Sequence, residues 1–373
     1  MNYLLRNANV ITPNRESFSL KKQDISIIDG YVSKLNEVKH YDKEIDFSGK
    51  IIYPALFNIH CHLGESVFKD ISGNEWDILK YLSYTESHNK SLSAQERKLE
   101  WDESAIFTIN ELCSVDTVGL CASRSAEICK QFSYCNMSGF PIMNSEKVIE
   151  FKKSGLNGFL EYKGKHQSPS CSVGIFLHSL YFNDSESLKF ASQAMQNGGE
   201  FITVHIAEDE QTYEKETSRF NKKPVFLLDE YGLLSEKTIL VHCGYASLEE
   251  LKLIKKRNAG IAICPISNHF LNTKIADINL LNELGIDWMI ATDGLATGRT
   301  LDMFTQANYL KKLFPNLSYE ELFYRMTKLP AKFFNRPCYT GAVEERTVAK
   351  FIVRPLVDNP IDQLFIEKPD FSL

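Results

Sequence analysis

From residue 51 onward the sequence repeats one local pattern, in which a short apolar run is followed by a loop and then by an amphipathic segment. The apolar runs are rich in β-branched and aromatic residues, so each is predicted to be a strand. These predicted strands lie near 55–60, 116–122, 134–142, 172–178, 201–205, 238–242, 260–265 and 287–292. Segments whose apolar residues recur with the period of a helix separate most of them, at 104–114, 185–196, 247–256 and 278–284.

Strands that alternate with helices eight times over roughly 280 residues are typical of a TIM-type (β/α)8 barrel. A doubly wound open sheet is the alternative fold with a similar alternation. We therefore expect an α/β protein with a distorted barrel domain over 51–334. The long loop of about 63–93 follows the first predicted barrel strand and contains a predicted short helix at 74–82. A loop of this length at a barrel mouth is expected to act as a lid.

Both ends of the chain lie outside the repeat and are predicted to be β-structure. Residues 1–50 contain several short strand-like runs, and Asp29 with Gly30 has the composition of a hairpin turn. Strand signals return after about residue 335. We expect 1–50 and 335–373 to pair as one small β-sandwich domain that flanks the barrel domain.

Residues that can bind metal stand at the ends of several predicted strands. His60 and His62 close the first strand, and side chains two apart in a strand point to the same face. His205, His242 and Asp293 each follow a later apolar run. A single histidine in this setting is more often a hydrogen-bonded core residue. Because a parallel barrel gathers the carboxyl ends of its strands at one face, the set as a whole predicts a metal-dependent hydrolase.

The order and spacing of these motifs resemble the amidohydrolase superfamily, in its branch of mononuclear deaminases and chlorohydrolases. The resemblance covers almost the whole chain. The matching segments are 54–64, 178–181, 205–208, 241–244, 264–268, 291–294 and 340–345.

The resemblance implies that His60, His62, His205 and Asp293 hold one divalent metal ion per chain. Their chemistry agrees, because catalytic zinc takes nitrogen and oxygen ligands and keeps one position for water. Zn²⁺ is favoured, and Fe²⁺ or Mn²⁺ suits the same ligands. Binuclear relatives carry a carbamylated lysine after the fourth strand. The segment 175–181 has no lysine, so a single metal is expected.

Catalytic or substrate-binding roles are expected for four residues. Glu208 is expected to protonate a ring nitrogen of the substrate, a task that suits a shielded carboxyl group. The alternative is that Glu208 belongs, with Asp209 and Glu210, to an acidic patch exposed to solvent. Asp293 is expected to relay a proton, and His242 to stabilise the reacting centre without binding metal. His178 is expected to contact substrate, with a structural histidine as its alternative.

Other substrate contacts are less specific. Asn268 and His269 follow the seventh strand and could reach the cleft, or could belong to a turn. Trp76 on the lid, with Phe68 and Tyr81, could stack on a flat heterocycle, although aromatic residues at helical spacing more often pack together. Arg299 lies near the barrel rim and would favour an acidic substrate if it faces the cleft.

Bulk composition excludes several partners. The net charge is -6 at pH 7 with no basic face, which disfavours nucleic acid. No apolar run approaches the roughly 20 residues that span a bilayer. The nine cysteines form no Cys-x-x-Cys motif, and no signal peptide is recognised, so reduced thiols and a cytoplasmic location are expected. A homodimer is expected from the resemblance alone.

The function predicted from these observations is metal-dependent hydrolytic deamination of an amino-substituted nitrogen heterocycle. A purine, a nucleoside or a pterin-like compound would be attacked by metal-activated hydroxide, with release of ammonia. Chlorohydrolysis and hydrolysis of a cyclic amide or imine use the same site and are the alternatives. A catalytically silent scaffold is disfavoured, because all four proposed metal ligands are present together with Glu208 and His242.

Overall fold

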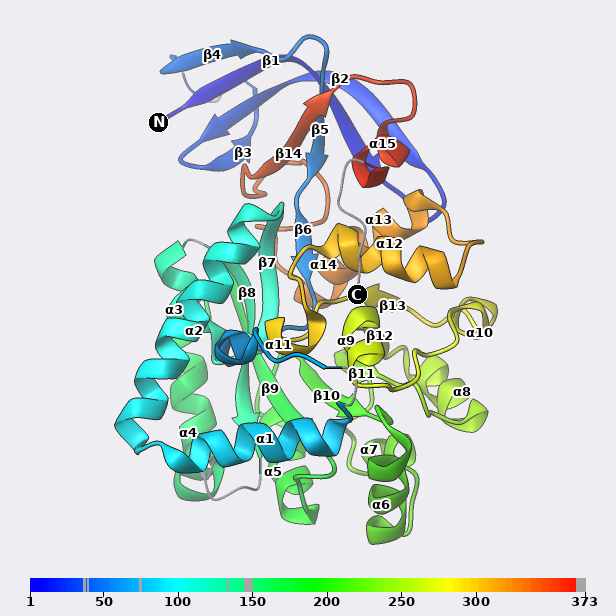
Figure 1. Cartoon of the computed structure of the whole chain (residues 1–373). Helices are drawn as coiled ribbons and strands as arrows, with labels where there is room; N and C mark the ends of the chain where they lie inside the picture. Colours follow the sequence, from blue (N-terminus) through cyan, green and yellow to red (C-terminus); the bar gives the residue numbers. More distant parts are fainter. Residues whose placement is uncertain (36–37, 39, 74–75, 133, 144–149, 367–373) are drawn as a thin grey trace.

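The computed structural model describes residues 1–366 apart from 36–37, 39, 74–75, 133 and 144–149 (Figure 1). Its centre is an eight-stranded parallel sheet in the order β13-β12-β11-β10-β9-β8-β7-β6. The strands are β6 (Leu56–Asn58), β7 (Thr117–Ser123), β8 (Cys135–Ile142), β9 (Cys171–Ser179), β10 (Ile202–Ile206), β11 (Thr238–His242), β12 (Gly260–Ile263) and β13 (Trp288–Ile290). Each overlaps one predicted strand, so the predicted barrel is confirmed.

The two end strands of this sheet, β6 and β13, are joined by a buried side chain. The amide of Asn58 donates to Thr292 Oγ1 at 2.6 Å, and its oxygen accepts the Thr292 backbone N–H at 3.2 Å. The Asp293 N–H also donates to the carbonyl oxygen of His60 at 3.3 Å. The barrel is therefore nearly closed, and this closure places the histidines after β6 beside Asp293.

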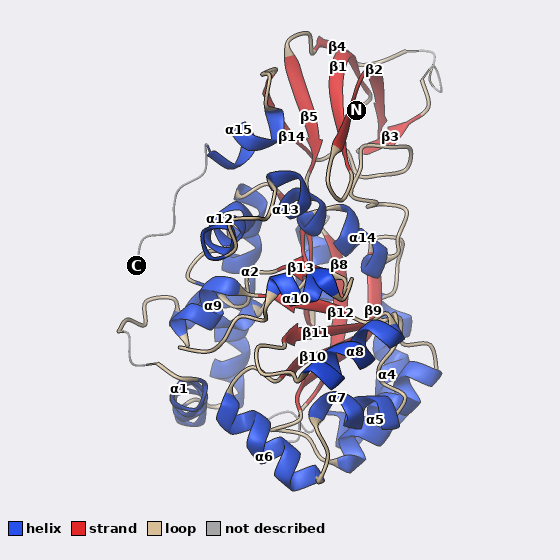
Figure 2. Cartoon of the chain, turned by 90° about the vertical axis from the view of Figure 1, so that its right-hand side faces the viewer, coloured by secondary structure: helices blue, strands red, loops and turns tan. Residues whose placement is uncertain are grey.

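Helices surround the strands (Figure 2). Those between strands are α2 (Ala94–Ser114), α3 (Ser125–Cys129), α4 (Glu150–His166), α5 (Ser185–Gln196), α6 (Glu210–Phe220), α7 (Pro224–Glu230), α8 (Leu248–Arg257), α9 (Pro265–Phe270) and α10 (Ile278–Glu283). After β13 come α11 (Leu295–Gly298), α12 (Met303–Leu313), α13 (Tyr319–Met326), α14 (Lys328–Phe334) and α15 (Pro360–Ile366), and the short 3-10 helix η2 (Lys130–Phe132) follows α3. The four helices predicted between strands are confirmed, in α2, α5, α8 and α10.

A second sheet, of six strands, contains residues from both ends of the chain. It has the order β14-β5-β1-β2-β3, and β4 also pairs with β1. Its strands are β1 (Tyr3–Pro13), β2 (Phe18–Ile28), β3 (Tyr31–Ser33), β4 (Lys43–Asp46), β5 (Lys50–Pro54) and β14 (Phe351–Pro355). The hairpin turn between β2 and β3 places Asp29 and Gly30 at positive φ, 51° and 83°. We propose a division into a β-domain of 1–50 with 335–373 and a barrel domain of 51–334, although β5 extends this sheet to Pro54 and residues 367–373 lie outside the described residues.

The segment after β6 covers the end of the barrel opposite this sheet (Figures 1 and 2). It forms the 3-10 helix η1 (Leu63–Phe68) and the helix α1 (Ile78–Ser91). The carboxylate of Asp77 accepts the Lys80 N–H at 2.9 Å, which caps α1 at its start. The helix predicted at 74–82 thus begins at Ile78, and residues 74–75 lie outside the described residues.

Candidate metal centre and active site

Three histidine nitrogens converge at the carboxyl ends of β6 and β10. The Nε2 atoms of His60, His62 and His205 form a triangle whose three sides are each 3.2 Å. Asp293 Oδ1 lies 3.5 Å from the Nε2 of His60 and 3.2 Å from that of His62. Bonds of about 2.0–2.1 Å from one zinc ion to each nitrogen would give similar spacing. The four residues form a cluster that can hold a metal ion.

The surroundings orient these ligands. The carbonyl oxygen of His178 lies 2.5 Å from His205 Nδ1, so the Nε2 atom of that ring faces the cluster. Ser267 Oγ donates to Asp293 Oδ2 at 2.6 Å, and Thr297 Oγ1 donates to it at 3.2 Å. The other carboxylate oxygen, Oδ1, is buried and has no hydrogen-bond partner among the described residues. An unpartnered oxygen that faces three imidazole nitrogens fits a metal ligand.

The electrostatics of the cluster favour a bound cation. Burial lowers the pKa of His60 to about 4 and lowers that of His205 further below its usual value, which keeps both rings neutral. Burial would also lower the pKa of His62, but the carboxylates of Glu65 and Asp293 outweigh it and raise that pKa to about 9. Burial would raise the pKa of Asp293, but His60 and His62 hold it well below the usual range. The carboxylates thus make the binding of a cation at this centre favourable.

Sharp turns at the strand ends aim several of these side chains into the barrel mouth. Ala207, His242, Cys243 and Asp293 all have positive φ, between 49° and 73°, although none of them is glycine. Such backbone conformations are costly for these residues and concentrate at functional sites. His242 is the last residue of β11, and Ala207 and Cys243 directly follow β10 and β11. Asp293 is the third residue after β13, where the chain turns away from the barrel.

Glu208 and His242 face each other beside the cluster. His242 Nε2 lies 3.4 Å from Glu208 Oε1, and His242 Nδ1 lies 3.5 Å from Asn268 Oδ1. Burial raises the pKa of Glu208 well above its usual value, and the carboxylates of Asp293 and Asp209 add to this shift. Burial also lowers the pKa of His242. Both groups are therefore kept neutral, and a neutral carboxyl group can donate a proton.

Two small adjoining cavities open onto this centre. Both are lined by Ile78 and Leu82 of α1 and by the predicted site residues His178, His205 and Glu208. The first extends toward Tyr181, Phe182, Thr212 and Glu216, and the second toward His62, Glu65, Tyr81, Leu271, Asp293 and Thr297. Helix α1 therefore forms one wall of both cavities.

The remaining sequence candidates have other contacts. Trp76 Nε1 donates to the Ser72 carbonyl oxygen at 3.0 Å, and the His269 ring packs on Tyr309 at 5.6 Å. The Arg299 guanidinium donates to the carbonyl oxygens of Lys69, Ile71 and Ala296 at 2.9–3.1 Å. The structure thus brings Asn268 to His242. Trp76 and Arg299 instead bind backbone carbonyl oxygens of the segment before α1, and His269 packs on Tyr309 of α12.

Sequence reasoning did not assign roles to Glu65, Thr297 or Glu216, which line these cavities. Glu65 could have been found, because it follows His62 by three residues.

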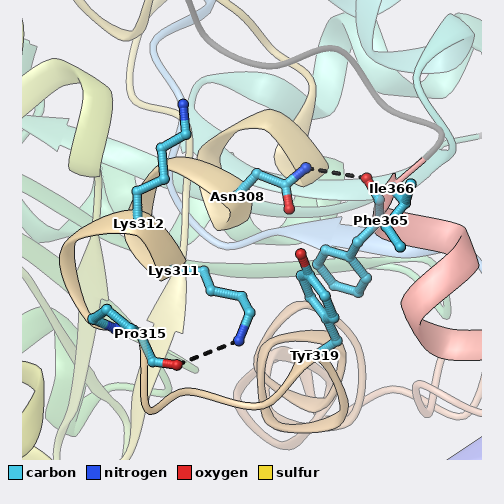
Figure 3. A pocket seen from close by; sticks show the side chains of 7 residues that line it. All are labelled: Asn308, Lys311, Lys312, Pro315, Tyr319, Phe365 and Ile366. Carbon is cyan, nitrogen blue, oxygen red and sulfur yellow. Dashed lines mark hydrogen bonds between the residues drawn. The ribbon is translucent and has the colours of Figure 1, made fainter.

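A further hollow lies between α12 and α15 (Figure 3). There Lys311 Nζ donates to the Leu317 carbonyl oxygen at 2.5 Å, so this lysine is already used in the fold.

We expect Glu216 to make the stability of the protein depend on pH. Burial raises the pKa of this carboxyl group to about 8. Because the unfolded chain would release the proton near pH 4.3, the free energy of unfolding should fall as pH rises from about 4.3 to about 8. Glu216→Gln should therefore stabilise the protein at pH 8 by about 1–3 kcal/mol and have little effect near pH 4. Thermal unfolding at both pH values measures this.

The matched control is Glu236→Gln at an exposed position. This variant should unfold like the parent protein at both pH values. An equal gain for Glu216→Gln at both pH values would mean that the Glu216 carboxyl is not held neutral by the fold.

Comparison with known proteins agrees with this geometry. The model of the amidohydrolase family matches residues 156–373, more than half of the chain. The chain belongs to the amidohydrolase family. The predicted resemblance is thereby confirmed, and so is the prediction of a hydrolase that acts on C–N bonds.

Two curated relatives match this amidohydrolase over most of its length. The 5-methylthioadenosine/S-adenosylhomocysteine deaminase of Pyrococcus furiosus is 27% identical over 354 residues, which cover 90% of this chain and 82% of the relative. The 5'-deoxyadenosine deaminase of Methanopyrus kandleri is 26% identical over 348 residues, which cover 86% and 76%. The similarity to these deaminases confirms the prediction of metal-dependent deamination of a heterocycle.

Solved structures share the fold of this amidohydrolase. Guanine deaminase from C. acetobutylicum with bound guanine has a TM-score of 0.80 at 22% identity, and the match covers 95% of this chain and 90% of that one. Atrazine chlorohydrolase from Arthrobacter aurescens in complex with zinc has a TM-score of 0.81 at 18% identity, over 98% and 91%. Within the described residues of this chain, a helix of the length and apolar character of a membrane span does not occur.

Proposed function

We propose that this amidohydrolase removes the 6-amino group of an adenine nucleoside modified at its 5' position and releases ammonia. Two deaminases of such nucleosides match 90% and 86% of the chain. The observation that carries the proposal is the convergence of three histidine nitrogens and the free oxygen of Asp293 beside the neutral carboxyl group of Glu208. This arrangement suits hydrolysis at a carbon next to a ring nitrogen.

In this proposal His60, His62, His205 and Asp293 would hold the metal. A divalent ion bound there supplies Lewis acidity that lowers the pKa of water toward about 7. Asp293 accepts the proton that the attacking water loses and passes it to the departing ammonia. Glu208 donates its proton to the ring nitrogen next to the carbon that bears the amine. His242, across from Glu208, forms a hydrogen bond to the oxygen at the developing tetrahedral carbon.

His178 and Asn268 have supporting roles in this proposal. His178 lines both cavities and would contact the substrate, while its backbone carbonyl orients His205. Asn268 would position His242 through the contact at Nδ1. Zinc as the native metal, a homodimer and a cytoplasmic location complete the proposal, on the grounds given by the sequence.

The experiment that tests this function is ammonia release by zinc-reconstituted protein. The panel contains 5'-methylthioadenosine, 5'-deoxyadenosine, adenosine, guanine and a pterin. We expect ammonia from the adenine nucleosides and about one metal ion per chain, the number that one cluster of four ligands holds. Removing the metal with a chelator should abolish the reaction, and adding zinc should restore it. No ammonia from the whole panel, with metal bound, would contradict the proposal and favour release of chloride or opening of a cyclic amide.

A further inference from the structure

A row of aromatic rings leads away from the metal cluster along the turn that follows β9. The ring of His178 meets that of Phe182 edge to face at a centroid distance of 5.1 Å, and Phe182 meets Tyr181 in the same way at 5.1 Å. All three residues line the cavity that reaches Thr212 and Glu216, which we call the outer cavity. Because edge-to-face packing orients aromatic rings, His178, Phe182 and Tyr181 form a defined aromatic wall of this cavity.

The rest of the outer cavity adds mostly apolar surface. Helix α1 contributes the aliphatic side chains of Ile78 and Leu82. The polar groups of α6 that line it already have bonds within the protein. The Thr212 hydroxyl donates to the carboxylate at the N-cap of α6. Burial raises the pKa of Glu216 to about 8, while a hydrogen bond from the Tyr181 backbone N–H lowers it. The surface that remains beyond the catalytic groups therefore suits an apolar part of a ligand.

Helix α6 holds the turn that carries the aromatic wall. Residues 180–183 form a turn in which the Asn183 N–H donates to the Leu180 carbonyl oxygen at 3.3 Å. The Arg219 guanidinium donates to the carbonyl oxygens of three of these four residues, Leu180, Tyr181 and Asn183. Carbonyl groups of a turn have no helix or sheet ladder to pair with, so a side chain that pairs with several of them fixes the turn. Among the described residues that line the outer cavity Arg219 does not occur, so it acts from outside.

The proposed reaction decides which part of a substrate would meet the aromatic wall. The carbon that loses its amine must lie at the metal, with the adjacent ring nitrogen at Glu208. The other cavity, which we call the inner cavity, is lined by His62 and Asp293, so the reacting carbon would lie there. Glu208 lines both cavities. The sugar of an adenine nucleoside is attached at the far end of the purine, so its 5' substituent would extend into the outer cavity.

We propose that Phe182 is a specificity-determining residue that packs against the 5' substituent of an adenine nucleoside, and that Arg219 is a positioning residue that holds Phe182 in place. This inference rests on the proposed deamination and narrows its substrate to nucleosides with an apolar 5' substituent. A methylthio group gains contact with the aromatic wall, whereas a hydroxyl group would give up hydrogen bonds to water on entering an apolar cavity.

A matched pair of probes tests this preference. 5'-Methylthioadenosine and adenosine differ only in the 5' substituent, which is methylthio in the first and hydroxyl in the second. With the zinc-loaded enzyme we expect kcat/KM for ammonia release to be at least roughly tenfold higher for 5'-methylthioadenosine, the scale of one extra apolar group in a pocket. Equal values, or a preference for adenosine, would overturn the inference and leave the proposed deamination intact. Ammonia from no adenine nucleoside would overturn both.

Variants of the two residues test their separate roles. Phe182→Ala should reduce the preference to about twofold or less, because the side chain that contacts the methylthio group is gone, and Phe182→Leu should keep part of it. Arg219→Ala should reduce the preference roughly fivefold, the scale of one hydrogen bond, mainly through KM. The matched control is Arg257→Ala, because this arginine of α8 binds Asp229 at 2.6 Å and not a turn of the cavity. It should leave the preference unchanged.

A double variant shows whether Arg219 acts through Phe182. Because Phe182→Ala already removes the preference, adding Arg219→Ala should not change the ratio of the two kcat/KM values further. Neither residue belongs to the metal cluster, so every variant should keep the parent's metal content. Loss of metal, or an equal fall in kcat for both nucleosides with the preference unchanged, would overturn the positioning role of Arg219. An unchanged preference in Phe182→Ala and Phe182→Leu would overturn the role of Phe182.

Discussion

Replacing Asp293 with asparagine should abolish turnover and release the metal. Ser267 and Thr297 both donate hydrogen bonds to Oδ2, so the carbonyl oxygen of an asparagine would take that place. Its amide nitrogen would then occupy the position of Oδ1, 3.2 Å from His62 Nε2 and 3.5 Å from His60 Nε2. An N–H donor there cannot bind a cation or accept the proton of the attacking water. We expect kcat/KM to fall by at least roughly 10³-fold.

Metal content per chain and ammonia release, measured on the same preparation, check this result. Asp302→Asn is a matched control, because Asp302 is also a buried aspartate but serves as the N-cap of α12. That variant should lose about 1 kcal/mol of stability or less and keep its metal and activity. Near-normal activity of the Asp293 variant would remove this residue from the mechanism.

The barrel was predictable from the sequence because its strands are short, buried and regularly spaced. The helices at the mouth were harder, because their sequences are polar. Helix α2 begins at Ala94, ten residues before its predicted start, and its first half is mostly charged. It is stabilised there by a capping box between Ser93 and Glu96. Among the short strand-like runs of residues 1–50, β1 is one strand of 11 residues with a bulge between Leu5 and Ala8.

The metal cluster was predictable for a different reason. Its residues follow strands, and the fold itself fixes where the ends of strands meet. Side chains on the rim are not fixed in this way. Arg299 has a positive φ of 59° and turns toward the loop before α1, and only its tertiary contacts decide this. The sequence identifies Tyr81 as an aromatic residue of the predicted lid. Its position beside Glu65 was not predictable, because it depends on how α1 packs against the barrel.

The second large effect concerns Glu208. Glutamine has nearly the same shape but cannot supply the proton that the ring nitrogen needs. Glu208→Gln should therefore lower kcat by roughly 10²-fold or more, the scale of general acid catalysis. Glu208 is not among the four residues of the cluster, so the metal content should not change. Because burial and then Asp293 raise the pKa of Glu208 well above its usual value, the activity of the parent enzyme should fall as pH rises through that raised pKa.

The control for Glu208→Gln is Glu210→Gln, which makes the same change of charge two residues later at an exposed position. It should leave kcat within about twofold of the parent, as is usual for an exposed residue without substrate contact. Single-turnover rates and metal content, measured across pH, distinguish the two roles that a buried carboxyl group can have here. A slow enzyme with full metal and no alkaline loss of rate identifies Glu208 as the proton donor. A parallel loss of metal and rate would instead make Glu208 a structural support of the cluster.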